Sequence, residues 1–222
     1  MSTSDETEYR QARFQPPPGA TELWLVRHGE SEPARPGAPF PLVDGQGDPA
    51  LSPEGRIQAE KLGERLGKER IDAVYVSTLR RTAQTAAPLA ARIGLVPRVD
   101  KDLREVHLGE WEGGLYRKKV AENDPIAQRM WEEERWDVIP DAEPAIAFAE
   151  RARRVIERLA KAHAGERLAV FTHGAFIGQV FALAAGSRPF AFLGADNASI
   201  SRLVVLGGTW AVRGFNDTAH LG

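Results

Sequence analysis

Short apolar runs along this chain alternate with segments whose apolar residues recur at helical spacing. The clearest runs lie at 22–26, 73–76 and 168–171, and they lack the polar alternation of a half-exposed strand. Strands that are apolar on both faces are typical of a parallel sheet covered by helices on both sides. The alternation therefore predicts an α/β fold, a three-layer α/β/α sandwich around a mostly parallel central sheet.

Further segments complete this predicted architecture. Helical patterns cover 53–68, 82–93, a face marked by Phe148 to Ala162, and a stretch that ends near Ala185. A short strand is predicted at 96–99. Two closing strands, 200–206 and 210–215, are predicted to form a hairpin that adds antiparallel edge strands, and an exposed edge of this kind is compatible with a homodimer.

Composition excludes several classes of function. The chain has 222 residues and no cysteine, which excludes thiol catalysis, thiolate zinc sites and iron–sulfur clusters and favours a cytoplasmic protein. Its 29 Lys and Arg residues nearly balance 31 Asp and Glu residues, so no basic footprint for a nucleic acid is present. No apolar run approaches the roughly 18 residues of a membrane-spanning helix. We therefore expect neither a nucleic-acid partner nor a membrane.

The domain organisation follows from the distribution of Pro, Gly and charge. Residues 1–20 are polar and acidic before a Pro-rich stretch, and we expect a disordered leader there. Residues 21–222 are long enough to form a single domain with its own core. Pro and Gly crowd the chain near 31–50, and we expect cap segments there and near 112–142.

Charged and polar side chains follow the ends of the predicted strands. Arg27-His28, Ser77 to Arg81 and Thr172-His173 each come directly after an apolar run. Ligands bind outside the carboxyl ends of the strands in sheets of this kind. Guanidinium groups recognise phosphate oxygens by bidentate, charge-assisted hydrogen bonds, and they keep a neighbouring imidazole neutral and nucleophilic. The grouping predicts a phosphate pocket with histidine chemistry.

Several sequence blocks resemble those of the histidine phosphatase superfamily, the phosphoglycerate-mutase-like clan. In chain order they are Leu25-Val-Arg-His-Gly-Glu-Ser31, Leu51-Ser-Pro-Glu-Gly55 with Gln58-Ala59, Ser77-Thr-Leu-Arg-Arg-Thr-Ala-Gln-Thr85, Leu103-Arg-Glu-Val-His-Leu-Gly-Glu-Trp-Glu-Gly113 and Val170-Phe-Thr-His-Gly174. The resemblance spans residues 23 to about 220. It implies a phosphoglycerate-mutase-like fold.

The resemblance also implies roles for particular residues. His28 corresponds to the nucleophile that forms phosphohistidine, and Arg27 and Arg81 to the arginines that hold the phosphoryl group. His173 corresponds to a further donor that stabilises charge during transfer. Glu105 corresponds to the general acid, which must hold a proton near neutral pH although the arginines lower its pKa. Burial of Glu105 beside Trp111 would raise its pKa and so compensate for the arginine charges.

Other residues of these blocks have less distinctive surroundings. Ser31 and Gly174 belong to the two His-Gly blocks and are expected to contact the substrate. Arg80 precedes the phosphate-binding position and is interpreted as a solvated helix start. Glu110 and Glu112 are interpreted as surface charges.

Basic and imidazole side chains elsewhere remain without an assigned role. Arg35 and Arg117 to Lys119 lie on segments that could close over a substrate, although a solvated role fits them equally well. His107, His163 and His220 have no comparable context. His220 belongs to a C-terminal tail similar to those of family phosphatases.

A metal centre is the competing explanation for His28, Glu105 and His173, because imidazole and carboxylate are ordinary zinc ligands. The sequence has no His-Glu-x-x-His or comparable close ligand pair, and arginines at the site repel a cation. We therefore expect no metal and no cofactor.

The resemblance covers both phosphatases and mutases. Mutases of the family follow the first His-Gly block with a segment ending in Trp-Asn, where this chain has Ser31-Glu-Pro-Ala-Arg-Pro-Gly37, and the acidic run Trp131-Glu-Glu-Glu134 disfavours a doubly phosphorylated ligand. The favoured function is a phosphomonoester hydrolase acting through phosphohistidine on a small phosphorylated metabolite. Mutase-type phosphoryl transfer and a non-catalytic phosphate-binding regulatory domain are the alternatives.

Overall fold

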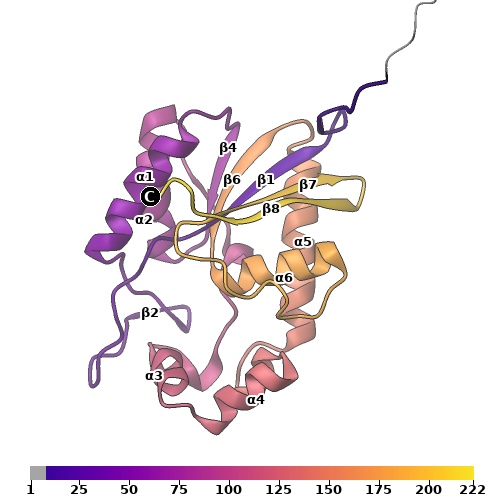
Figure 1. Ribbon diagram of the computed structural model, residues 1–222. Coiled ribbons are helices and arrows are strands. Elements are labelled where there is room, and N and C mark those ends of the chain that lie inside the picture. Colours follow the sequence, from indigo (N-terminus) through magenta and orange to yellow (C-terminus); the bar gives the residue numbers. More distant parts are fainter. Residues whose placement is uncertain (1–8) are drawn as a thin grey trace, which may run out of the picture.

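The structure, a computed structural model, describes residues 9–222 (Figure 1). Residues 1–8 of the predicted leader lie outside the described part. Residues 9–20 contain no helix or strand. A contact joins this segment to the sheet: the Arg213 guanidinium lies 3.6 Å from the centre of the Phe14 ring. No helix of residues 9–222 is long and apolar enough to cross a membrane.

A six-stranded mixed sheet forms the centre of the fold, and its strands lie in the order β5-β4-β6-β1-β7-β8. The strands are β1 (Thr21–Arg27), β4 (Ala73–Val76), β5 (Arg98–Val99), β6 (Arg167–Thr172), β7 (Ile200–Leu206) and β8 (Thr209–Asp217). β5, β4, β6 and β1 are parallel, and the β7–β8 hairpin pairs antiparallel against β1. The predicted mostly parallel sheet with a closing hairpin is confirmed.

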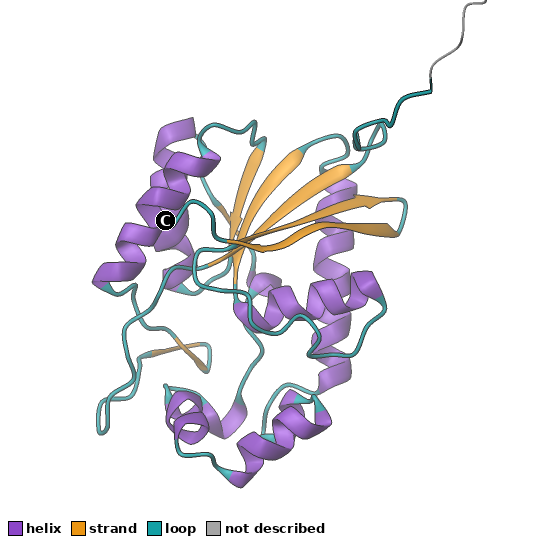
Figure 2. Ribbon diagram, in the orientation of Figure 1, coloured by secondary structure: helices purple, strands orange, loops and turns teal. Residues whose placement is uncertain are grey.

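Helices cover both faces of this sheet (Figure 2). The helices α1 (Pro53–Leu66) and α2 (Arg80–Ile93) pack on the face of β1 that bears Trp24 and Val26, whereas α5 (Ala145–Ala162) and α6 (Gly174–Ala185) pack on the face that bears Leu23 and Leu25. Alternate residues of one buried strand thus enter two separate cores, which explains why the strand is apolar on both faces. The three-layer prediction is confirmed.

Local signals place most element boundaries. Ser52 caps α1 by accepting a hydrogen bond from the Gly55 N–H, and α2 ends where Gly94 adopts a left-handed conformation with φ of 68°. The predicted strand at 96–99 is shorter than expected, because only Arg98–Val99 pairs with β4 and Val96 is 85% exposed.

A second group of elements lies beyond the carboxyl ends of the parallel strands (Figure 1). It comprises the small β2 (Leu42–Val43) and β3 (Gln46–Gly47) hairpin, α3 (Leu115–Ala121), α4 (Pro125–Glu133), and the 3-10 turns η1 (Lys101–Leu103), η2 (Gly109–Trp111) and η3 (Trp136–Val138). The sequence patterns did not predict these elements. They stand over the sheet edge where the predicted site residues end.

Candidate active site

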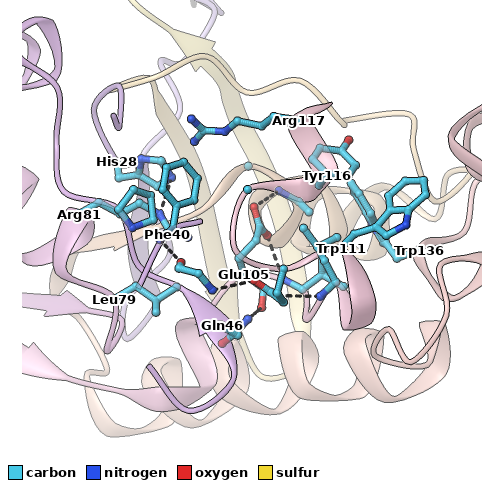
Figure 3. Close-up of a pocket in the computed structure, with 18 of the residues that line it drawn as sticks. His28, Phe40, Gln46, Leu79, Arg81, Glu105, Trp111, Tyr116, Arg117 and Trp136 are labelled. Atoms are coloured by element: carbon cyan, nitrogen blue, oxygen red, sulfur yellow. Dashed lines mark hydrogen bonds between the residues drawn. The ribbon is translucent and has the colours of Figure 1, made fainter. Parts of the chain in front are cut away.

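A cavity of about 370 Å³ lies between the strand ends and this second group of elements (Figure 3). The predicted site residues Arg27, His28, Arg81, Glu105 and Gly174 all line it. The structure therefore brings together residues that lie far apart in the sequence, from Arg27 to Gly174. The parallel arrangement of β1, β4 and β6 accounts for this, since their carboxyl ends meet at one sheet edge.

His28 directly follows β1 and is buried, with a fixed ring orientation. Its Nδ1 lies 2.7 Å from the Gly29 carbonyl oxygen, which can only accept, so Nδ1 carries the proton and Nε2 keeps its lone pair. Nε2 in turn accepts from Arg81 Nε at 3.1 Å. Burial, followed by the charges of Arg81 and Arg27, holds the pKa of His28 well below its usual value. The imidazole is therefore neutral at neutral pH.

Arg27 is the last residue of β1 and presents its guanidinium to the cavity. Its Nη1 donates to the Ala195 carbonyl oxygen at 2.6 Å, and within residues 9–222 nothing accepts from its buried Nε–H. A Cβ at Gly174 would stand 3.3 Å from that Nε, so the glycine permits a close approach of α6 to the guanidinium. Arg27 thus keeps donors that suit an anion.

His173 precedes α6, and its ring centre lies 5.2 Å from that of His28. Its Nε2 lies 2.8 Å from Ser77 Oγ, which also accepts from the Leu79 N–H at 3.2 Å and lies 3.2 Å from Thr82 Oγ1. Its Nδ1 is buried without a partner among the described residues. Burial and the Arg81 charge keep the pKa of His173 well below its usual value. Its Nδ1 is therefore the ring atom left for a bound group.

Glu105 is held at the N-terminus of α6. Its Oε2 accepts from the Ala175 N–H at 3.1 Å, and its Oε1 accepts from the N–H groups of Phe176 at 3.0 Å and Val106 at 3.1 Å. Burial raises the pKa of Glu105, and this effect outweighs the backbone hydrogen bonds and the nearby arginine charges, which lower it. The carboxyl group therefore keeps a proton at higher pH than an ordinary glutamic acid.

Arg151 of α5 fixes the backbone around Glu105, a contact that the sequence analysis missed. Its guanidinium donates to the carbonyl oxygens of Asp102 at 2.8 Å, Arg104 at 3.0 Å and Glu105 at 3.2 Å, and it pairs with Glu143 at 2.7 Å. No local sequence signal could have revealed this, because the partners are far apart in the chain and Arg151 lies on an ordinary amphipathic helix.

One interpretation of a charged residue was wrong. Glu112 is not a surface charge, because it accepts from the N–H groups of Gly47 at 2.7 Å and Leu108 at 2.9 Å. Arg80 is the first residue of α2 and is exposed, as interpreted, but its Nε also pairs with the buried Asp48 at 2.8 Å, and its N–H donates to the same carboxylate at 2.7 Å. In both places a carboxylate, that of Glu112 or Asp48, satisfies otherwise unpaired backbone donors.

Ser31 and Arg117 connect the two cap segments. Arg117 lines the cavity and donates to Ser31 Oγ at 2.7 Å and to the Glu32 carbonyl oxygen at 2.8 Å. Ser31 itself does not line the cavity and contacts it through Arg117. Arg35 and His220 also lie outside the cavity lining, and Arg35 is exposed.

The site offers little to a metal ion. Across residues 9–222 no three His, Asp or Glu side chains are grouped so that they could share one. The oxygens of Glu105 accept backbone N–H groups, and the guanidinium groups of Arg27, Arg81 and Arg117 line the same cavity.

Fold and cavity together define an α/β protein with an arginine-lined pocket at the carboxyl edge of a mostly parallel sheet. The chain belongs to the histidine phosphatase superfamily: the sequence profile of branch 1 of that superfamily matches residues 23–218. The family predicted from the sequence blocks is confirmed.

Individual relatives include both phosphatases and mutase-like proteins. The chain is 35% identical over 207 residues to the metal-independent phosphoserine phosphatase of Arabidopsis thaliana, covering 90% of this chain and 83% of that one. It is 33% identical over 205 residues to phosphoglycerate mutase-like protein 4 of the same plant, covering 90% and 86%. A mycobacterial glucosyl-3-phosphoglycerate phosphatase structure superimposes with a TM-score of 0.73 at 28% identity, covering 90% of this chain and 100% of that one.

Proposed function

We propose that this protein is a phosphomonoester hydrolase that acts through a phosphohistidine at His28. The observation that supports it best is the neutral His28 ring, whose Nε2 lone pair faces Arg81 in a cavity that also holds a carboxyl group of raised pKa. A nucleophile, an anion-binding guanidinium pair and a proton donor are the groups that phosphoryl transfer requires.

The first step transfers the phosphoryl group to the protein. The Nε2 lone pair of His28 forms a bond to phosphorus as the ester P–O bond breaks, and the departing alkoxide takes the proton of Glu105. Arg27, Arg81 and His173 bind the phosphoryl oxygens, where negative charge is distributed in the transition state. The step ends with phosphohistidine, a free alcohol and an ionised Glu105.

The second step restores the protein. The Glu105 carboxylate takes a proton from a water molecule as its oxygen attacks phosphorus, and the N–P bond breaks. Inorganic phosphate leaves, His28 is again neutral, and Glu105 is again protonated. No further reactant is needed, since one water is consumed for each ester hydrolysed.

Hydrolysis is favoured over mutase chemistry by the charge of the cavity. A bisphosphorylated intermediate needs a second set of cations, yet Arg117 is the one arginine of the described lining apart from Arg27 and Arg81. The Arg117 guanidinium is engaged with Ser31 and Glu32. A cytoplasmic location and a homodimeric state stay predictions from the sequence.

Turnover of 4-nitrophenyl phosphate in the presence of EDTA tests the proposal. We expect the wild type to be active with EDTA, His28→Ala to lose at least about a thousandfold in kcat, and His220→Ala, a histidine outside the cavity lining, to keep its activity. Acid-labile phosphate trapped on the wild type and absent from His28→Ala would identify the intermediate. Activity retained in His28→Ala would disprove the nucleophile, and efficient isomerisation of 3-phosphoglycerate with bisphosphoglycerate would favour the mutase.

A further inference from the structure

The cavity has two chemically different halves. His28 and Arg81 lie on one side of Glu105, and Trp111, Tyr116 and Trp136 on the other (Figure 3). The first half suits a phosphate group. The second half must receive the part of the substrate that leaves as the alcohol, because Glu105, the proposed proton donor to the alcohol, stands between them.

The second half is an aromatic wall formed by the rings of Trp111, Tyr116, Trp131 and Trp136. Ring centres are 6.3 Å apart for Trp111 and Tyr116, and 5.9 Å for Tyr116 and Trp136. Phe190 extends the row, at 5.1 Å from Trp136 and 5.7 Å from Trp131. Trp111 is buried, whereas Trp131 is 49% exposed. Phe190 lies outside the cavity lining and contacts both Trp131 and Trp136, whose rings line it.

The two carboxyl groups of the described cavity lining already accept hydrogen bonds from the backbone. Glu105 accepts three backbone N–H groups, and both oxygens of Glu112 accept backbone N–H groups as well. Burial raises the pKa of Tyr116 to about 12, so its hydroxyl stays neutral. An ammonium group placed against this wall would lose part of its hydration and would have to share Glu105 or Glu112 with the backbone donors that these side chains already accept.

The cavity also has few cationic side chains that could bind a carboxylate in the leaving group. Beyond Arg27 and Arg81, Arg117 is the one cationic side chain in the described lining, and its guanidinium lies 5.2 Å from the centre of the Phe40 ring while it donates to Ser31 and Glu32. A substrate carboxylate bound there would have to use the remaining N–H groups of a guanidinium that already joins the two cap segments. Charged hydroxy acids therefore fit this half less well than apolar groups.

We propose that the cavity takes monophosphate esters of flat, uncharged, apolar alcohols, such as arylmethyl or aryl phosphates, in preference to esters of charged hydroxy acids. This inference rests on the proposed phosphatase function and specifies its substrate class. A ring inserted between the aromatic wall and Phe40 would stack in offset or edge-to-face geometry and displace water from apolar surface. The cavity volume of about 370 Å³ lies at the small end of small-molecule sites, which suits a compact ester.

The test compares benzyl phosphate with glycerol 3-phosphate and phosphoserine. All three release an alcohol of high pKa, so differences in kcat/KM report recognition of the leaving group rather than its departure. We expect kcat/KM for benzyl phosphate to exceed the other two by at least about tenfold. Phosphoserine or glycerol 3-phosphate turned over as well as benzyl phosphate would overturn the substrate class and leave the phosphatase function standing, whereas hydrolysis of none of the esters, with no phosphohistidine formed, would overturn both.

Trp131 supplies the matched variant, because its half-exposed ring can be truncated with little effect on the fold. Trp131→Ala should lower the ratio of kcat/KM for benzyl phosphate to that for glycerol 3-phosphate by about threefold to tenfold, and Trp131→Phe should restore most of it. Ile146→Ala, which truncates a 75% exposed side chain outside the cavity lining, is the control. An unchanged ratio in Trp131→Ala, with the midpoint of thermal unfolding preserved, would overturn the role of the aromatic wall.

Discussion

Arg81 donates its Nε–H to Nε2 of His28 at 3.1 Å, so the atom proposed to attack phosphorus is held by a guanidinium proposed to bind the phosphate. Burial lowers the pKa of Arg81 to about 10, which still leaves the group charged at neutral pH. A bound phosphate competes for this donor, since a charge-assisted bond to an anionic oxygen is stronger than one to imidazole. Substrate binding would thereby free the Nε2 lone pair of His28 at the moment when phosphorus lies next to it.

Replacing Arg81 should therefore be far more damaging than replacing its neighbour. We expect Arg81→Ala to lower kcat/KM by about a hundredfold to a thousandfold, the usual cost of removing one donor to a developing anion. Arg80→Ala should stay within about threefold, because its half-exposed ion pair with Asp48 lies outside the cavity lining. Steady-state kinetics at matched thermal stability would measure both, and equal losses would contradict the assignment.

The role of Glu105 predicts a dependence on the leaving group. Glu105→Gln should slow hydrolysis of benzyl phosphate by about a hundredfold to ten-thousandfold, because its alkoxide cannot depart without a proton. The pre-steady-state burst with 2,4-dinitrophenyl phosphate should survive, since that phenolate is stable, and phosphohistidine should accumulate as the general base is missing. Rapid-quench measurement of both esters tests this. A loss of equal size in the two bursts would argue against proton donation.

The pKa shifts predict an unsymmetrical pH profile. Because the pKa of His28 is lowered well below its usual value, its imidazole is neutral where an ordinary histidine titrates and should produce no acidic limb at about pH 6.5. Because the pKa of Glu105 is raised, its acid form persists above the usual carboxyl range and activity should fall as pH rises through that value. The profile of kcat/KM, corrected for ionisation of the substrate phosphate, would show this, and Glu105→Gln should lack the alkaline limb.

Those parts of the fold that have a local cause were predictable. The apolar strand β1 ends at Arg27, and a helix cap at Ser52 or a left-handed glycine at Gly94 marks a boundary within a few residues. His28 and His173 were found by the same means, since each directly follows a strand of a parallel sheet. Placement at a common edge is a consequence of topology rather than of long-range contact.

The remaining features depend on contacts between distant segments. The hydrogen bonds of Arg151 to the Glu105 backbone and the pairing of Arg80 with Asp48 have no local signature. The cap helix α3 has no buried residue, so its sequence lacks the apolar spacing from which a helix is predicted. The balance between burial and arginine charge on Glu105 likewise required the three-dimensional surroundings.

Gly55 provides the last prediction, because it sets the position of the loop that contains the nucleophile. A Cβ on Gly55 would lie 1.9 Å from the Glu30 carbonyl oxygen, and a Cβ on Gly29 would lie 2.5 Å from the Gly55 carbonyl oxygen. Backbone therefore packs directly on backbone, with no flexible side chain that could yield. The sequence Leu51-Ser-Pro-Glu-Gly55 thus serves the site although none of its polar side chains lines the cavity.

Gly55→Ala should push the loop after His28 away from α1. We expect a loss of about 1–3 kcal/mol in the free energy of unfolding, the usual cost of overpacking, and at least a tenfold loss in kcat/KM because the Nε2 atom is displaced from the phosphate site. Arg56→Ala, on the exposed side of the same helix, should change stability by no more than about 0.5 kcal/mol. Chemical denaturation and steady-state kinetics measure the two effects, and a Gly55→Ala protein with full stability and full activity would show that the contact does not position the nucleophile.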